Sequence, residues 1–300
     1  MQKNAGLSNI KLNNSHMIEI GNLEFTYQNT QKTAVKDMSF KVKEGEVYGF
    51  LGPSGAGKTT TQRLIIGLLR NYTGSIKIFG KERSSWGKEF YEQIGVAFDF
   101  PNLYLKLTPE ENLKLIGAYY KNGISDIPAM LDRVGLLPDR NTRVESFSKG
   151  MKMRLNFIRS IMHNPKLMFF DEPTSGLDPV NAHIIKDIIL EQKAAGKTIF
   201  LTTHNMTVAE QLCDRVSFIV DGKIVVTGSP ADLMIEHGKR LLNINYIKEG
   251  AEHSEEFDLK QIGENEHFLN IIKNEEIRTI HTCEATLEDI FIKLTGKNLQ

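Results

Sequence analysis

A glycine-rich loop constrains the fold of this chain more than any other feature of its sequence. Residues 52–59 read Gly-Pro-Ser-Gly-Ala-Gly-Lys-Thr and fit the pattern G-x-x-x-x-G-K-[ST]. A short apolar run at 47–51, typical of a buried parallel strand, precedes them, and apolar residues with helical spacing follow at 60–69. This strand–loop–helix order predicts an α/β fold in which the loop surrounds a phosphate group.

The residue types in the loop suit a nucleotide. Glycine lets backbone N–H groups turn inward around an anion. The positions expected to contact phosphate oxygens in this way are Gly52, Ser54, Gly55 and Gly57. Lys58 is expected to reach the β- and γ-phosphates, and the Thr59 hydroxyl to ligate Mg²⁺. Thr60 adds a further hydrogen bond to phosphate.

A second strand delivers two acidic residues. Residues 167–170 are apolar, and Asp171 and Glu172 follow at the carboxyl end, where α/β sheets hold their ligands. We expect Asp171 to hold Mg²⁺, directly or through water, and Glu172 to orient and deprotonate the attacking water. Such a pair standing alone would be read as a solvated acidic turn. Together with the loop it predicts nucleotide hydrolysis.

Composition argues against several other classes of protein. The 300 residues carry 37 Lys plus Arg against 37 Asp plus Glu, so overall charge does not favour nucleic acid as a partner. No apolar run approaches the roughly 18 residues needed to cross a bilayer, which assigns any membrane role to a partner or the surface. Residues 1–16 lack the apolar centre of a secretory signal, and two isolated cysteines, Cys213 and Cys283, favour a reducing cytoplasm.

The chain is expected to have three parts. Residues 1–16 are polar and predict a flexible N-terminal extension. Residues 17–230 form the main domain, in which helical stretches punctuated by proline and glycine predict a helical subdomain over about 100–162. After a boundary near 228–230, residues 231–300 carry 14 acidic against 8 basic residues, which predicts a small acidic C-terminal domain of mixed α and β structure.

Over residues 17–230 the chain resembles the ATP-binding subunits of ABC transporters, because further motifs follow in that family's order. Residues 147–151, FSKGM, stand where the family carries its signature, commonly L-S-G-G-Q. Ser148 and Gly150 match the signature, whereas Lys149 and Met151 depart from it. The resemblance implies that this segment, at the start of a helix, binds the γ-phosphate of the nucleotide held by the opposite subunit.

Three more positions match residues with roles in the family. Residues 175–178, SGLD, match the loop that links the two active sites and include Asp178. His204, after a predicted strand, matches the switch histidine that contacts the γ-phosphate. Tyr27 matches the aromatic residue that stacks on adenine, although for a tyrosine taken alone simple packing would be the safer interpretation.

One position departs from the family pattern. Where the family has a glutamine that senses Mg²⁺ and couples to the membrane subunit, this chain has Asp99. Aspartate can ligate Mg²⁺, but its charge would oppose a nearby γ-phosphate. Asp99 is therefore expected to act through the metal or water, or else the nucleotide response is altered. The neighbouring segment 99–108 is the candidate surface for a membrane partner.

The C-terminal end resembles one branch of the family. Residues 285–299, ATLEDIFIKLTGKNL, are similar to the end of ATP-binding subunits from the drug- and antibiotic-exporter branch, the ABC-2 type. Their spacing alone predicts an amphipathic docking helix. Its apolar face would consist of Leu287, Ile290, Phe291 and Leu294.

The resemblance implies an α/β P-loop NTPase of the ABC ATPase type, with a parallel-sheet core, an antiparallel β subdomain, a helical subdomain and a small α+β C-terminal domain. It implies an enzyme that hydrolyses ATP with Mg²⁺ as a head-to-tail homodimer, or beside a related second ATPase subunit. The pair would lie at the cytoplasmic face of the cell membrane and power a separate permease. The cargo implied is a drug, an antibiotic, a lipid or another small molecule; nucleic acid is not an expected partner.

Three other functions fit parts of the sequence. A soluble ABC-type ATPase acting on nucleic acid or ribosomes would usually show a second ATPase unit, a long coiled-coil insertion or zinc-binding cysteines, and none is visible. A P-loop GTPase would need an Asn-Lys-x-Asp motif, which does not occur. The third alternative is a module that binds nucleotide without hydrolysing it. Asp99 would be compatible with such a module, because it stands where the family has its Mg²⁺-sensing glutamine, but Asp171, Glu172 and His204 favour hydrolysis.

Overall fold

A computed structural model describes residues 16–28, 32–121, 123–238 and 240–297. The predicted N-terminal extension therefore lies outside the described residues, except for His16. The chain forms two compact units. The first comprises the described residues up to Tyr48 together with Thr59–Leu201, and the second comprises Gly49–Lys58 and the described residues from Thr202 onward. The domain boundaries expected from the sequence stay predictions.

The first unit contains an antiparallel sheet of four strands in the order β2-β1-β4-β5. The strands are β1 (His16–Thr26), β2 (Thr33–Lys43), β4 (Thr73–Ile78) and β5 (Lys81–Glu82). Buried and exposed residues alternate along β2, as the period of two in a half-buried strand requires. β1 pairs antiparallel with both β2 and β4. This sheet is the predicted antiparallel β subdomain.

The central sheet has six strands in the order β10-β9-β3-β8-β7-β6. They are β3 (Val47–Leu51), β6 (Ile94–Ala97), β7 (Leu167–Asp171), β8 (Thr198–Thr203), β9 (Arg215–Val220) and β10 (Lys223–Gly228). Every residue of β3, β7 and β8 is buried, which explains their continuous apolar runs. β6 and β7 pair in parallel, whereas β9 and β10 form an antiparallel hairpin that turns at Asp221-Gly222.

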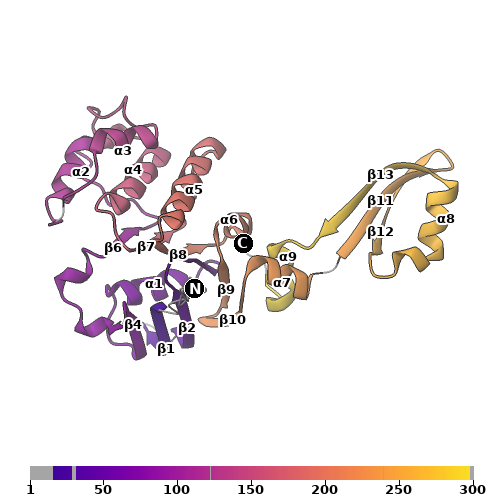
Figure 1. The fold of residues 1–300 in the computed structure, drawn as a ribbon, viewed down its shortest axis with the longest axis horizontal. Helices are drawn as coiled ribbons and strands as arrows, with labels where there is room; N and C mark the ends of the chain where they lie inside the picture. Colours follow the sequence, from indigo (N-terminus) through magenta and orange to yellow (C-terminus); the bar gives the residue numbers. More distant parts are fainter. Residues whose placement is uncertain (1–15, 29–31, 122, 239, 298–300) are drawn as a thin grey trace, which may run out of the picture. The chain divides into compact units, whose positions relative to one another are not determined.

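Helices follow the strands of the first unit. α1 (Lys58–Ile66) continues directly from the glycine-rich loop, and α5 (Pro179–Ala194) follows β7. Three helices, α2 (Pro109–Gly117), α3 (Ile127–Arg133) and α4 (Lys149–Ile161), lie side by side as the predicted helical subdomain (Figure 1). Thr108 caps α2 in a reciprocal capping box with Glu111, and Pro109 occupies the first turn, where its missing N–H would have no partner within the helix.

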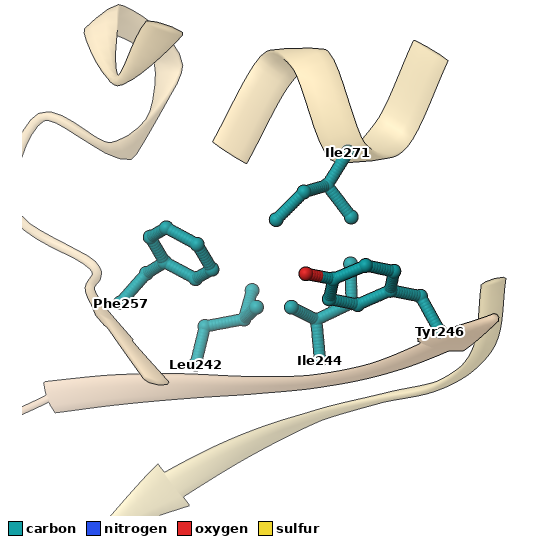
Figure 2. Packing of buried hydrophobic residues seen from close by; sticks show 5 residues of the cluster. All are labelled: Leu242, Ile244, Tyr246, Phe257 and Ile271. Carbon is teal, nitrogen blue, oxygen red and sulfur yellow. The ribbon is translucent and has the colours of Figure 1, made fainter. Parts of the chain in front are cut away.

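The second unit ends in a small α+β structure. Its three-stranded antiparallel sheet has the order β12-β11-β13, with β11 (Arg240–Lys248), β12 (Ala251–Asp258) and β13 (Glu276–Glu284). α8 (Glu266–Asn274) covers one face, and Figure 2 shows Ile271 of this helix above side chains of the sheet. The core consists of Leu242, Ile244, Tyr246, Phe257 and Ile271.

The remaining helices of the second unit are α6 (Met206–Leu212), α7 (Pro230–His237) and α9 (Leu287–Thr295). α9 is the predicted C-terminal amphipathic helix. Its Phe291 is fully buried and packs edge-on against Phe218 of β9, with ring centroids 5.2 Å apart. Of the predicted apolar face, Leu294 alone is only half-buried. Among the described residues, no helix is both long and apolar enough to span a membrane.

Candidate nucleotide-binding site

The glycine-rich loop folds around the side chain of Lys58. The Lys58 ammonium group donates hydrogen bonds to the carbonyl oxygens of Gly52 at 2.5 Å and Pro53 at 3.1 Å, and the residue is 8% exposed. Gly52 must be glycine, because a Cβ there would lie 2.2 Å from the carbonyl oxygen of Ile219. Gly57 has a φ of +107°, a conformation that L side chains rarely adopt. The local backbone therefore requires both glycines and places a positive charge within the loop.

Thr59 and Asp171 come together in the first unit. The Thr59 hydroxyl donates a hydrogen bond of 2.9 Å to Oδ2 of Asp171, the last residue of β7, which is 2% exposed. Hydroxyl and carboxylate oxygens are the hard ligands that Mg²⁺ takes, usually one or two from the protein with the rest from water and phosphate. This donor set therefore fits Mg²⁺ bound together with a nucleotide.

Tyr27 lies beside the first turn of α1. Its hydroxyl is 3.1 Å from the hydroxyl of Thr60, and its half-buried ring packs edge-on against Phe25, with centroids 4.9 Å apart. The structure thus brings together Tyr27 and the helix that begins at the phosphate loop. Stacking of Tyr27 on adenine stays a prediction.

Glu172 has a strained backbone. Its φ is +49°, an uncommon left-handed conformation for a residue other than Gly, Asn or Asp. The Glu172 carbonyl accepts a hydrogen bond of 3.0 Å from the amide of Ser175, which closes the turn after β7. Strain of this kind concentrates at functional sites. The turn ends β7 at Asp171 and leaves Glu172, half-buried, immediately beyond the strand.

The signature segment adjoins the 175–178 loop within the first unit. Ser148 caps α4 by accepting a hydrogen bond of 3.2 Å from the amide of Met151. A Cβ added to Gly150 would meet Leu177 Cδ2 at 3.5 Å, which is ordinary van der Waals contact. The fold of this chain therefore has room for a Cβ at position 150, so packing alone does not exclude alanine there.

Asp178 occupies the N-cap of α5. Its carboxylate accepts hydrogen bonds from the backbone amide of Asn181 at 3.2 Å and from the Asn181 side chain at 2.5 Å. These hydrogen bonds, the side-chain one above all, hold the pKa of Asp178 below its usual value. Asp178 is thus fixed as an exposed carboxylate at the end of the loop.

Asp99 and His204 lie at exposed turns. Asp99 is two residues beyond the end of β6, and His204 directly follows β8 in the second unit. After His204, Asn205 caps α6 by accepting a hydrogen bond from the amide of Val208. The roles assigned to Asp99 and His204 stay predictions.

Two residues of α4 that no sequence motif indicates contact the segment around Asp99. Asn156, on α4 and 1% exposed, donates a hydrogen bond of 3.0 Å to the carbonyl oxygen of Phe98. Arg159, one turn further, donates to the carbonyl oxygen of Asn102 and to Asn156 Oδ1. These contacts fasten the segment around Asp99 to the helix that starts at the signature. A buried asparagine between Leu155 and Phe157 was the available sequence signal.

The strand–loop–helix around Lys58, the Asp-Glu pair after a buried strand, and the sheet that contains both define a P-loop nucleotide-binding ATPase. The family model described as "ABC transporter" matches residues 35–175, and one described as "Fluoroquinolone efflux ABC transporter C-terminal domain" matches residues 240–284. The chain is 46% identical over 286 residues to a fluoroquinolones export ATP-binding protein of Mycobacterium tuberculosis, and the aligned residues cover 95% of each of the two chains. It is 33% identical over 288 residues to the Nod factor export ATP-binding protein I of Paraburkholderia xenovorans, covering 90% of this chain and 94% of that one.

Solved structures of ATP-binding subunits from ABC transporters are also similar to this chain. One described as the ATP-binding subunit of an ABC transporter has a TM-score of 0.67 and 30% identity, covering 73% of this chain and 92% of its own. A dimeric ATP-binding cassette in a post-hydrolysis state, bound to ADP and Pi, has a TM-score of 0.65 and 26% identity, covering 71% and 98%. The chain belongs to the ATP-binding subunits of ABC transporters. It is an ATP-hydrolysing subunit of the drug-exporter branch, and the predicted family, fold class and enzyme class are confirmed.

Proposed function

We propose that this chain binds ATP with Mg²⁺ and drives a separate membrane permease that exports a drug-like small molecule of the fluoroquinolone class. The observation that carries the ATP site is the hydrogen bond between Thr59 and Asp171, because it brings a metal-ligating hydroxyl to the acidic end of β7. The cargo class is supported by the name of the 46% identical relative and by the match of residues 240–284.

Each side chain has a definite task in this proposal. Lys58 binds the β- and γ-phosphates, while Thr59 and Asp171 hold Mg²⁺, which would neutralise phosphate charge as it develops. Glu172 accepts a proton from the attacking water, and His204 holds the γ-phosphate in place. Tyr27 stacks on adenine. Asp99 is proposed to reach the metal through water.

The active form is proposed to be a head-to-tail pair, either two copies of this chain or this chain with a related second ATPase subunit. Each ATP lies between the loop of one subunit and Ser148 and Gly150 of the other, with Asp178 in the loop that links the two sites. ATP closes the pair because both subunits bind each γ-phosphate, and hydrolysis opens it. The room for a Cβ at Gly150 supports this geometry, since a phosphate bound by the partner would explain why the residue is glycine.

We propose that the permease binds the segment 99–108 from the membrane side, with the subunit on the cytoplasmic face. Three large apolar side chains there are exposed: Phe100 at 73%, Tyr104 at 52% and Leu105 at 48%. Asn112 fixes this segment from both sides, since it accepts from the amide of Tyr104 at 2.9 Å and donates to its carbonyl at 3.0 Å. A rigid apolar ridge of this kind suits a protein partner.

ATP hydrolysis by purified protein tests the site. Lys58→Ala should abolish tight ATP binding, because the loop loses its positive charge. Glu172→Gln should keep ATP binding and lose nearly all turnover. Glu252→Gln, at an exposed carboxylate of β12, is the matched control and should behave as wild type. Rapid hydrolysis by Glu172→Gln would refute the role proposed for that residue.

A further inference from the structure

Lys149 is the first residue of α4 and the one charged residue of the segment 147–151. The common form of the family's signature, L-S-G-G-Q, has glycine at this position, so this chain adds a cation there. The first turn of α4 contains no acidic residue. Because the N-terminal end of a helix is electropositive, a lysine at its first position is unfavourable within the chain. A residue that opposes the local electrostatics in this way marks a candidate functional position.

The charge of Lys149 is not balanced by the described part of the chain. Lys149 is exposed, and its ammonium group forms no hydrogen bond or ion pair with any residue that the structure describes. Glu145, four residues earlier, pairs with another lysine at 2.7 Å, and Asp178 accepts hydrogen bonds within the first turn of α5. Lys152 adds a second cation three residues further along α4, on the same side of the helix. An anion from outside the chain would therefore be favoured beside Lys149.

The side chain of Lys149 lies along the loop that joins β7 to α5. A Cβ added to Gly176 would meet Lys149 at Cε, 3.4 Å away, and at Nζ, 3.5 Å away. Gly176 has a φ of +70° and no side chain, which leaves this path open. The same loop begins at Glu172, the proposed base, and ends at Asp178. The ammonium group thus lies beside the two segments, 147–151 and 175–178, that are proposed to face the opposite subunit.

We propose that Lys149 acts in trans, donating a hydrogen bond from its ammonium group to the γ-phosphate of the ATP bound by the opposite subunit. This role depends on the head-to-tail pair proposed above and adds a charged contact to that pair. The Ser148 hydroxyl and the backbone amides of the segment are neutral donors, whereas a charge-assisted hydrogen bond is about twice as strong as a neutral one. Lys149 would therefore stabilise the closed pair and also the charge on the phosphoryl oxygens during hydrolysis.

ATP-dependent dimerisation in the Glu172→Gln background tests the contact. Lys149→Gln keeps the aliphatic part of the side chain and removes the charge, so dimerisation measured by analytical ultracentrifugation should weaken roughly tenfold or more. ATP binding by the monomer should not change, because Lys58 is intact. Lys149→Arg should retain dimerisation. Raising salt from about 0.05 to 0.5 M should weaken the parent dimer more than the Lys149→Gln dimer, since exposed ionic contacts are screened.

Two controls separate this role from a structural one. Lys260→Gln, at an exposed lysine of the C-terminal structure, should dimerise as the parent does. Without nucleotide, the unfolding midpoint of Lys149→Gln should equal that of wild type or be slightly higher, because the start of α4 no longer carries an opposed cation. A lower midpoint would make Lys149 a structural residue and overturn the proposal.

Hydrolysis by mixed pairs tests whether Lys149 acts on the opposite nucleotide. Lys58→Ala and Lys149→Gln chains should each hydrolyse little ATP alone. In a mixed pair, one site combines an intact phosphate loop with an intact Lys149, so the mixture should hydrolyse ATP faster than the sum of the two variants. Lys58→Ala mixed with Glu172→Gln is the matched control and should show no such recovery, because the phosphate loop and Glu172 of one site belong to the same chain.

The outcomes distinguish Lys149 from the pair on which its role depends. Weaker dimers of Lys149→Gln together with recovery in the mixture support the proposal. Dimerisation and hydrolysis by Lys149→Gln equal to the parent would overturn it and leave the pair intact, and absence of recovery in the mixture would overturn the action in trans. If Glu172→Gln chains with Lys149 intact form no ATP-dependent dimer, the pair itself is refuted, and the role of Lys149 with it.

Discussion

Substitution of Gly150 by alanine should have different effects on the stability of the isolated chain and on the formation of the proposed dimer. Within the chain, the added Cβ would lie 3.5 Å from Leu177 Cδ2 and 3.8 Å from the carbonyl oxygen of Gly176, so nothing has to move. Alanine is favoured over glycine in a helix by roughly 0.5–1 kcal/mol. Since Gly150 is the second residue of α4, we expect the low end of that range. The isolated chain should therefore be as stable as wild type or slightly more stable.

ATP-dependent dimerisation should weaken, because the same Cβ would occupy the space proposed for the γ-phosphate bound by the opposite subunit. A hydrogen bond to a charged group contributes roughly 1.5–3 kcal/mol. A symmetric pair has two such sites, so closure should weaken by about 3–6 kcal/mol, which is more than a hundredfold in the dimerisation constant.

Two assays on the same protein measure these opposite effects. Thermal unfolding of the Gly150→Ala chain without nucleotide should give a midpoint equal to wild type or up to about 2 °C higher. Size-exclusion chromatography with ATP, in the Glu172→Gln background, should show a monomer where the parent protein is a dimer. Gly263→Ala is the control, since a Cβ there meets no atom within 4 Å. A lower unfolding midpoint, or ATP-dependent dimers of normal affinity, would refute the reasoning.

Four further predictions concern other parts of the molecule. Thr59→Val keeps the side-chain shape but removes a metal-ligating hydroxyl, so the Mg²⁺ concentration that half-saturates ATP hydrolysis should rise at least tenfold; an unchanged requirement would contradict the role of Thr59. Asn156→Ala leaves the Phe98 carbonyl without its donor and should cost roughly 1–3 kcal/mol in chemical denaturation. Ile244→Ala, in the fully buried core of the C-terminal sheet, should cost roughly 2–5 kcal/mol by the same measurement, and a cost below 1 kcal/mol would show that the core packs otherwise. Hydrogen bonds from Tyr246, and next from His267, hold the pKa of Glu255 below its usual value, so this carboxylate should stabilise the fold above its unfolded pKa of about 4.3 and lose that effect as pH falls further; the unfolding midpoint of Glu255→Gln should therefore depend less on pH in that range.

The sequence predicted those parts of the fold that depend on local pattern. The runs at 47–51 and 167–170 could be recognised because a strand buried on both faces is apolar throughout, and the loop at 52–59 because few residue types can surround a phosphate. Helix ends were less certain. Apolar residues continue with helical spacing to Tyr120, but α2 ends at Gly117, because the amides of Tyr119 and Tyr120 donate to carbonyl oxygens three residues back and not four.

Contacts between distant segments could not be predicted. Asn156 and Phe98 are 58 residues apart, and their hydrogen bond depends on how α4 packs against β6. The pairing of β11 with β13 is equally remote from any local signal, although the acidic composition did indicate a separate part of the chain.

The central claim is that this subunit powers a membrane permease, and affinity purification tests it most directly. The Glu172→Gln variant is purified from gently solubilised cells with ATP present, so that the closed pair persists, and the retained proteins are identified. We predict a multi-span membrane protein at stoichiometric level, lost when Phe100 and Leu105 are both replaced by serine. Ribosomal proteins or nucleic acid instead, with no membrane protein in several detergents, would contradict the account.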